Sequence, residues 1–238
     1  MIKLSSVSDK VPGAPEHIQL LTLDSPPENG WNGDALDGLH DLLGGLARKS
    51  PSPPLVVTGA GADWFCGGTR DSVPTDARVS LSQLARLYSK AFAALRKYPA
   101  LTVAAINGRT NDEGLALALS CDFRVASDTA VFGINAPKEG RFPMGGTTQL
   151  LPRLVGESIS KRMMLCGLTW TAETALQHGL VDEISTNPVA AAVDMLAPAK
   201  SLDPVVVQGI RQLVEHARMR PLETGFAAER DWQNTLEE

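Results

Sequence analysis

Two glycine-containing stretches of this chain hold residues suited to stabilising a developing negative charge. One is Cys66-Gly67-Gly68-Thr69, which follows an apolar run beginning at Leu55, and the other is Asn111-Asp112-Glu113-Gly114, which precedes an apolar helical pattern. A strand that leads through a loop into a helix presents free backbone N–H groups to an anion. Two such loops can together hold one oxyanion. The chemistry indicated is therefore oxyanion stabilisation by backbone donors.

The elements that must position these loops follow from hydrophobic periodicity. Apolar, partly β-branched runs predict strands at His17–Leu23, Leu55–Thr58, Leu101–Ile106, Phe123–Ala126 and Ala130–Phe132. Helical spacing predicts helices that start near Asn32 and Gly114 and helices over Leu81–Tyr98, Glu157–Cys166, Ala172–His178, Asn187–Leu196, Asp203–Met219 and Leu222–Leu236. Strands separated by helices favour right-handed crossovers and a mainly parallel sheet. We expect an irregular lead-in over residues 1–15 and a mobile polar segment over residues 69–80.

Composition narrows the classes of function. The 238 residues are 43% hydrophobic, enough for one substantial core, and the net charge of −5 argues against a nucleic-acid-binding surface. Three cysteines without C-x-x-C spacing read as buried apolar residues in a reducing compartment. No stretch is long and apolar enough for a membrane span or signal peptide, so we expect a cytoplasmic protein without a membrane partner.

Further motifs follow the two loops in a fixed order. They are Phe132-Gly133, the run from Gly140 to Gln149, the run from Leu151 to Gly156, and the run from Ala175 to Val181. Together with the loops they resemble the crotonase (enoyl-CoA hydratase/isomerase) superfamily over roughly residues 17 to 235. The resemblance implies an α/β crotonase fold, in which repeated ββα units form a spiral with a C-terminal helical region. It also implies a crotonase core over residues 1–195 and a helical trimerisation region over residues 196–238, shorter than usual in the family.

The resemblance also implies site residues and partners. Its enzymes bind an acyl thioester of coenzyme A or of an acyl carrier protein, so no cofactor is needed beyond the coenzyme A or phosphopantetheine of the substrate. Gly67 and Glu113 match its two oxyanion donors, and Asp112 is a third catalytic candidate. The implied substrate-binding residues are Cys66, Gly68, Thr69, Arg70, Gly114 and Lys138; no metal site is expected. The assembly implied is a homotrimer or hexamer.

The chain departs from the family where acid/base chemistry is expected. The family usually has three glycines where this chain has Asp112-Glu113-Gly114, and its two catalytic glutamates are replaced by Ala116 and Ala136. A methyl group can neither position water nor move a proton, so hydration by the usual route is not expected. Two subgroups also lack this glutamate pair: the decarboxylase of polyketide β-branching and dihydroxynaphthoyl-CoA synthase. The loop at Cys66–Thr69 is similar to the former, and the stretch Ala136–Phe142 to the latter.

Three functions remain open at this stage. The first is a lyase or isomerase that forms an enolate from an acyl thioester, by decarboxylation or other C–C bond chemistry. The second is an enoyl-thioester hydratase or isomerase whose acid/base is Asp112, Glu113 or Glu139. The third is a degenerate, non-catalytic member that acts as a binding or structural partner.

Each of the candidate site residues below also has a structural interpretation. Asp112 can instead be a helix cap and Lys138 a solvated loop residue. Arg70 can be a surface charge rather than a partner for a substrate carboxylate or a coenzyme A phosphate. Glu113 either faces the cavity, where its protonated form would quench an enolate, or turns outward from a rebuilt loop.

Overall fold

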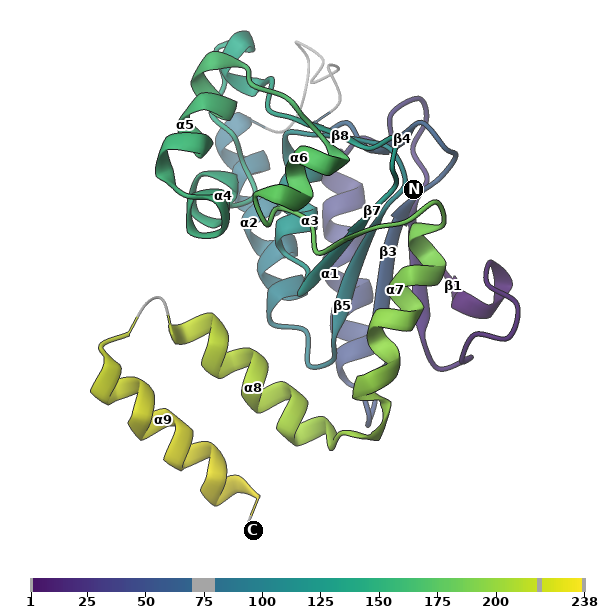
Figure 1. Ribbon diagram of the computed structural model, residues 1–238, viewed down its shortest axis with the longest axis vertical. Coiled ribbons are helices and arrows are strands. Elements are labelled where there is room, and N and C mark those ends of the chain that lie inside the picture. Colours follow the sequence, from purple (N-terminus) through teal and green to yellow (C-terminus); the bar gives the residue numbers. More distant parts are fainter. Residues whose placement is uncertain (1, 70–79, 218–219, 237–238) are drawn as a thin grey trace.

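The computed structural model describes residues 2–69, 80–217 and 220–236 (Figure 1). Its strands are β1 (Ile2–Ser6), β2 (Gln19–Leu23), β3 (Leu55–Gly59), β4 (Trp64–Cys66), β5 (Thr102–Ile106), β6 (Arg109–Asn111), β7 (Phe123–Ala126), β8 (Val131–Gly133), β9 (Trp170–Thr171) and β10 (Glu183–Ile184). Its α-helices are α1 (Gly33–Ala47), α2 (Leu81–Arg96), α3 (Glu113–Leu119), α4 (Thr147–Val155), α5 (Glu157–Cys166), α6 (Ala172–Gln177), α7 (Pro188–Leu196), α8 (Pro204–Ala217) and α9 (Leu222–Thr235). Short 3-10 turns include η2 (Ala136–Glu139).

The strands form two sheets. The larger has the order β1-β2-β3-β5-β7-β10 and is parallel except for β1, which pairs antiparallel with β2 at the edge. The smaller has the order β4-β6-β8-β9. Each repeat places its first strand in the larger sheet and its second in the smaller, and then continues into a helix: β3-β4-α2, β5-β6-α3 and β7-β8-α4. This is the expected crotonase architecture of repeated ββα units.

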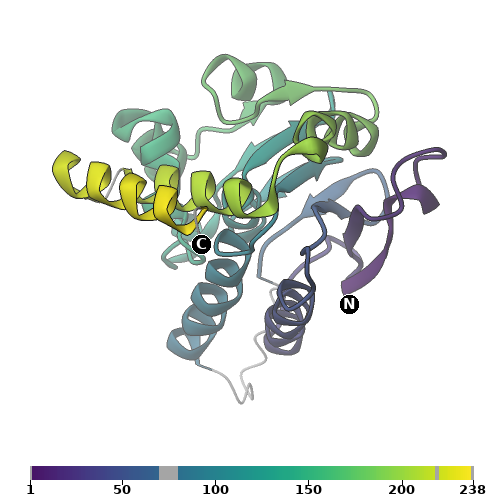
Figure 2. The same cartoon turned by 90° about the horizontal axis from the view of Figure 1, so that it is seen from below.

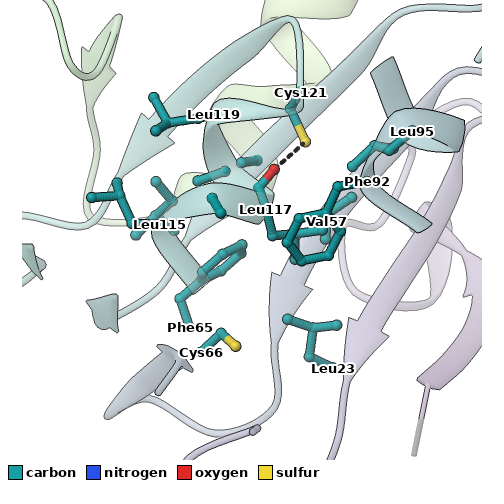
Figure 3. Packing of buried hydrophobic residues seen from close by; sticks show 14 of the residues in the cluster. Leu23, Val57, Phe65, Cys66, Phe92, Leu95, Leu115, Leu117, Leu119 and Cys121 are labelled. Atoms are coloured by element: carbon teal, nitrogen blue, oxygen red, sulfur yellow. Dashed lines mark hydrogen bonds between the residues drawn. The ribbon is translucent and has the colours of Figure 1, made fainter. Parts of the chain in front are cut away.

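Both faces of the larger sheet are buried. Alternate strand residues such as Leu21 and Val57 pack with α1, α2 and α3, while their neighbours Leu20 and Val56 pack with α7. The two views show the sheet between these layers (Figures 1 and 2). Figure 3 shows the packing around α3, where Leu117 lies among apolar side chains from β3, β4 and α2. The short helix α3 is therefore held by apolar packing against β3, β4 and α2.

The last two helices extend away from this core (Figures 1 and 2). They pack on each other through Trp232 of α9, whose ring would lie 2.9 Å from a Cβ placed on Gly209 of α8. Gly209 is the one buried residue that the two helices contribute among the described positions. We call α8 and α9 the C-terminal arm.

Two ion pairs attach the C-terminal arm to the core: Glu215 of α8 lies 3.7 Å from the Arg96 Nε of α2, and Arg211 makes the more buried pair. The Arg211 Nε lies 2.8 Å from Oδ1 of Asp122, and Nη1 donates to the Tyr98 carbonyl. Asp122 in turn accepts hydrogen bonds through Oδ2 from the backbone N–H and the hydroxyl of Thr102. The Asp122 carboxylate therefore links α8 to the start of β5.

Some expectations from the sequence need correction. Residues 1–15 are not irregular throughout, because Ile2–Ser6 forms the edge strand β1. The apolar face of the helix predicted over residues 81–98 is covered by the same chain, since Leu84, Tyr88 and Phe92 are buried in its core. Most of the segment expected to be mobile, residues 70–79, lies outside the described residues. In the part of the chain that the structure describes, no helix is long and apolar enough to cross a membrane.

Candidate functional site

The two loops singled out in the sequence meet in the fold. Strands β4 and β6 pair in parallel, so the residues after both strands emerge at the same edge. Gly68 has φ +92°, and a Cβ placed on it would lie 2.9 Å from Oε2 of Glu113 and 3.3 Å from the Glu113 backbone nitrogen. A Cβ on Gly114 would lie 2.3 Å from the Cys66 carbonyl oxygen. Both glycines thus allow the loops to approach as closely as they do.

Glu113 turns inward rather than outward. It is fully buried, and its Oε2 accepts hydrogen bonds from the backbone N–H and the hydroxyl of Thr69, both at 2.8 Å. Because the Thr69 hydroxyl donates to Glu113, its oxygen accepts from the Tyr88 hydroxyl at 3.0 Å. Burial and the nearby Glu113 carboxylate raise the pKa of Tyr88 well above its ordinary value, which keeps it a donor. The Glu113 backbone N–H has no acceptor among the described residues.

Asp112 does not cap its own helix. It precedes α3 with φ 48°, an unusual value for a residue other than glycine, and its side chain makes no capping hydrogen bond to α3. Instead Oδ1 accepts hydrogen bonds from the backbone N–H groups of Asn135 and Ala136, both at 2.7 Å. Burial is the largest influence on this carboxyl group and raises its pKa to about 6, against the hydrogen bonds that favour its charged form.

The positions of the two missing glutamates are closed by packing. Ala116 and Ala136 are both fully buried. A Cβ on Gly145 would lie 2.9 Å from the Ala116 Cβ and 2.7 Å from the Phe92 ring, so no space for a carboxylate remains at position 116. At position 136, however, the Asp112 carboxylate lies against the backbone. One carboxylate has therefore been supplied from a different part of the chain.

Gly67 differs from the prediction of a free donor. Its N–H donates to the backbone carbonyl of Glu28 at 2.7 Å, and the Glu28 side chain covers its Cα. Glu28 belongs to the loop before α1, which the sequence did not connect with the site. A thioester oxygen can use the Gly67 N–H only if this loop segment moves away. Of the two predicted oxyanion donors, the Glu113 N–H alone has no acceptor among the described residues.

Arg141 is the site residue that sequence reasoning missed. Its Nε and Nη2 both donate to Oε2 of Glu139, while Nη1 is buried without a partner among the described residues. Burial lowers the pKa of the guanidinium, but the carboxylates of Glu139, Glu113 and Asp112 more than offset this and leave the pKa above its ordinary value. The Arg141 backbone N–H donates to the Ala136 carbonyl at 2.9 Å, and the Ala136 N–H donates to Asp112, so Ala136 connects the two residues. The only signal in the sequence was its place five residues after Ala136.

Other predicted substrate-binding residues lie apart from this cluster or outside the described residues. Lys138 lies across the C-terminus of α5, since a Cβ on Gly167 would be 2.7 Å from its Cε, so the structure does not bring it to the carboxylates. Cys66 is fully buried in the core, and burial raises the pKa of its thiol to about 12. Arg70 lies outside the described residues. No group of His, Cys, Asp and Glu that could hold a metal occurs among those residues.

A separate cavity of about 740 Å³ lies at the opposite edge of the larger sheet. Its lining includes Pro54 and Leu101, which precede β3 and β5, together with Val193 of α7 and Val205 of α8. None of the residues predicted to carry chemistry lines it. The loop ends after β4 and β6 therefore remain the candidate active site.

Comparison with known proteins agrees with this geometry. Residues 13–238 match the family model described as enoyl-CoA hydratase/isomerase. The chain is 34% identical over 199 residues to the probable enoyl-CoA hydratase EchA14 of Mycobacterium tuberculosis, which covers 81% of this chain and 76% of that protein. It is 31% identical to (E)-benzylidenesuccinyl-CoA hydratase of Thauera aromatica, over 88% of this chain and 83% of that protein.

The solved structure of Pseudomonas aeruginosa DspI is similar as well, with a TM-score of 0.87 and 36% identity over 93% of this chain and 92% of that chain. The names of the curated relatives agree with the second of the three functions left open, hydration or isomerisation of an enoyl thioester. These names give no support to decarboxylation and do not confirm a subgroup that lacks the catalytic glutamates.

Proposed function

Because this chain belongs to the enoyl-CoA hydratase/isomerase family, we propose that it hydrates an enoyl thioester of coenzyme A, or shifts its double bond, with relocated acid/base groups. The observation that carries this proposal is the position of Asp112. Its carboxylate accepts hydrogen bonds from the backbone at Ala136, where the family's second glutamate would stand. A pKa of about 6 gives Asp112 both protonation states near neutral pH.

Asp112 has the connections that proton transfer requires. Oδ1 is held by two backbone donors, whereas Oδ2 makes no hydrogen bond to a described residue. The fixed oxygen orients the group, and the free one exchanges a proton. The Glu113 backbone N–H donates to the thioester oxygen. The Glu113 side chain provides a second buried carboxylate.

Glu113 and Asp112 can together supply and accept every proton that hydration requires. A water oxygen bonds to the β-carbon of the enoyl group and its proton passes to Glu113, while the electrons of the double bond move onto the thioester oxygen. Protonated Asp112 then donates its proton to the α-carbon as the enolate collapses. Transfer of the proton from Glu113 to Asp112 restores the starting state.

The test is a panel of enoyl-CoA thioesters with mass-spectrometric product analysis. We expect gain of water or a shifted double bond with the parent, and a rate lowered about 10²-fold or more in Asp112→Asn. Asp128→Asn is the matched control, because Asp128 is an exposed turn residue that accepts a hydrogen bond from Ser127. Loss of CO2 as the only reaction would replace this proposal by decarboxylation. Equal rates in both variants would remove Asp112 from the mechanism.

A non-catalytic binding role is the second candidate, and one observation favours it. The Gly67 N–H is already satisfied by the Glu28 carbonyl, so the oxyanion hole of this structure is half closed. If none of the thioesters in the panel is altered while coenzyme A thioesters still bind, the binding role is the better description. A carrier protein in place of coenzyme A is the alternative source of the thioester, and the same panel on phosphopantetheine tests it.

A further inference from the structure

The cavity of about 740 Å³ at the amino ends of β2, β3 and β5, which we call the amino-end cavity, has a floor of core residues. Ile18, Val193 and Leu196 line it, are all buried, and belong to the apolar cluster on one face of the larger sheet. The volume lies within the range of small-molecule binding sites. A floor of this kind favours a ligand with an apolar body, because such a ligand removes apolar surface from water.

Prolines are frequent in the wall of the amino-end cavity. A proline has a fixed φ and no backbone N–H. The wall is therefore conformationally restricted, and at these positions it offers no backbone donor to a charged group. Side chains are the groups available to hold a charge on the ligand. Six of the 16 prolines of the chain line the cavity: Pro12, Pro15, Pro51, Pro54, Pro99 and Pro204.

The charged groups of the amino-end cavity lie at its mouth. The ionisable side chains in its lining are His17, Lys49, Asp194 and Lys200, and all four residues are exposed. In the part of the chain that the structure describes, neither lysine forms an ion pair. Two lysines against one aspartate give the mouth a positive balance, although the net charge of the chain is −5. This local excess favours an anion.

The base of the C-terminal arm adds apolar surface to one side of the cavity. Leu202 and Val205 are 49% and 38% exposed, and both belong to the lining. A ligand in the cavity would cover part of this surface. The loops after β4 and β6 contribute no residue to the lining, so such a ligand would leave the thioester site free.

We propose that the amino-end cavity binds an amphipathic monocarboxylate, a molecule with one carboxylate and an alkyl body, such as a medium-chain fatty acid. The alkyl body lies on the floor formed by Ile18, Val193 and Leu196, and the carboxylate lies at the mouth with Lys49 and Lys200. A neutral or cationic ligand with the same alkyl body makes the first contact without the second. The inference does not depend on the proposed function, because no residue of the catalytic loops takes part.

The test compares three ligands that share one alkyl chain: decanoate, decanol and decyltrimethylammonium. Calorimetric titrations of the full chain should show one decanoate per chain, bound about fivefold or more tightly than decyltrimethylammonium, in keeping with the modest strength of exposed ion pairs. Decanol should bind with an affinity between the two. The double variant Lys49→Met, Lys200→Met should lose most of the preference and bind decanol within about twofold of the parent.

Lys161→Met is the matched control, because Lys161 is an exposed lysine of α5 that lies outside the cavity. It should keep the full preference. Hydrogen exchange then locates the ligand: bound decanoate should increase protection over residues 11–18 and 197–208 and leave residues 64–69 and 111–114 unchanged. Ala14→Trp places a ring in the cavity and should abolish binding, with the circular dichroism of the parent retained.

Several results would overturn the inference. Equal affinity for decanoate and decyltrimethylammonium would do so, as would a preference that survives in the double lysine variant. Uptake of decanoate without saturation would indicate nonspecific binding, and displacement by butyryl-CoA would assign the acid to the thioester site. Failure of the assembled protein to bind decanoate would mean that a neighbouring copy closes the cavity. Each of these results would leave the hydration of enoyl thioesters untouched.

Discussion

The Asp112 carboxylate lies against the backbone of Ala136, the position at which the family usually has its second catalytic glutamate. The change has an energetic cost. Asp112 is 5% exposed and holds a φ of 48°, so both desolvation and backbone strain act on one residue. Strain of this kind persists when surrounding contacts fix it, and here those contacts are the N–H groups of Asn135 and Ala136.

The raised pKa of Asp112 predicts a pH-dependent stability. In the unfolded chain its carboxyl group loses its proton near pH 3.8, but in the folded protein only near pH 6. Between these values the folded state retains a proton that the unfolded state has released, so the contribution of Asp112 to stability falls as pH rises. Relative to the parent, Asp112→Asn should gain up to about 3 kcal/mol between pH 4 and pH 7. Urea unfolding at both pH values measures this difference, and a constant difference would contradict it.

Gly68 offers a second prediction, with a built-in control. An alanine at Gly68 (φ +92°) or at Gly61 (φ +79°) carries a similar backbone penalty of about 1 to 2 kcal/mol. Only at Gly68 does the new methyl group meet the Glu113 carboxylate, whereas Gly61 has open space around it. We expect both variants to lose similar stability in thermal unfolding, and only Gly68→Ala to lose activity by about tenfold or more. Equal activities would show that the Glu113 position is not critical.

At the scale of elements, hydrophobic periodicity predicts the positions of the long helices correctly. The helices over Glu157–Cys166 and Pro188–Leu196 lie where the pattern predicts them, because one apolar face repeats over several turns. The strands β4 and β6 have three residues each and were not predicted, since both fall in predicted loops and β6, Arg109-Thr110-Asn111, contains no apolar residue. They are the strands that bring the two loops together.

The side chains of the site were predictable only in part. The meeting of the Gly68 and Glu113 loops followed from the motifs. The partners of Asp112 and Glu113 did not, because those partners lie 23 to 44 residues away in the chain. The Glu28 carbonyl on the Gly67 N–H had no sequence signal either, since any residue supplies a carbonyl.

The attachment of α8 to the core gives a prediction at the same scale. Arg211 and Asp122 are 10% and 21% exposed, so removal of the guanidinium would leave a largely buried carboxylate without its ion pair. We expect Arg211→Ala to lower the free energy of unfolding by about 3 kcal/mol. Hydrogen exchange should rise over α8 and α9 before it rises over the sheet. Unchanged protection of the arm would show that other contacts hold it.

The whole molecule exposes a long apolar surface on its C-terminal arm. Seven large hydrophobic residues of the arm and the turns at its ends are exposed: Leu202, Val205, Ile210, Val214, Leu222, Phe226 and Leu236. Solvent-exposed apolar faces of this extent mark interaction surfaces. The trimerisation region predicted from the sequence for residues 196–238 provides the reason for such a surface.

We therefore expect a homotrimer or hexamer in solution. Light scattering at micromolar concentration should give the mass of three or six chains. A variant with Ile210, Val214 and Phe226 changed to serine should give the mass of one chain, with the sheet intact by circular dichroism. The matched control is Leu165→Ser, an exposed apolar residue of α5 that lies outside the arm. A stable monomer of the parent would contradict the prediction.

The exposed arm has a consequence for how the protein responds to dilution. If copies of the chain cover one another's arms, association adds to the stability of each copy by mass action. The apparent melting temperature should then rise with protein concentration, whereas that of a self-contained monomer would not. At low protein concentration the arm would lose this cover first, and the Arg211–Asp122 and Glu215–Arg96 contacts would still hold it to the rest of the chain.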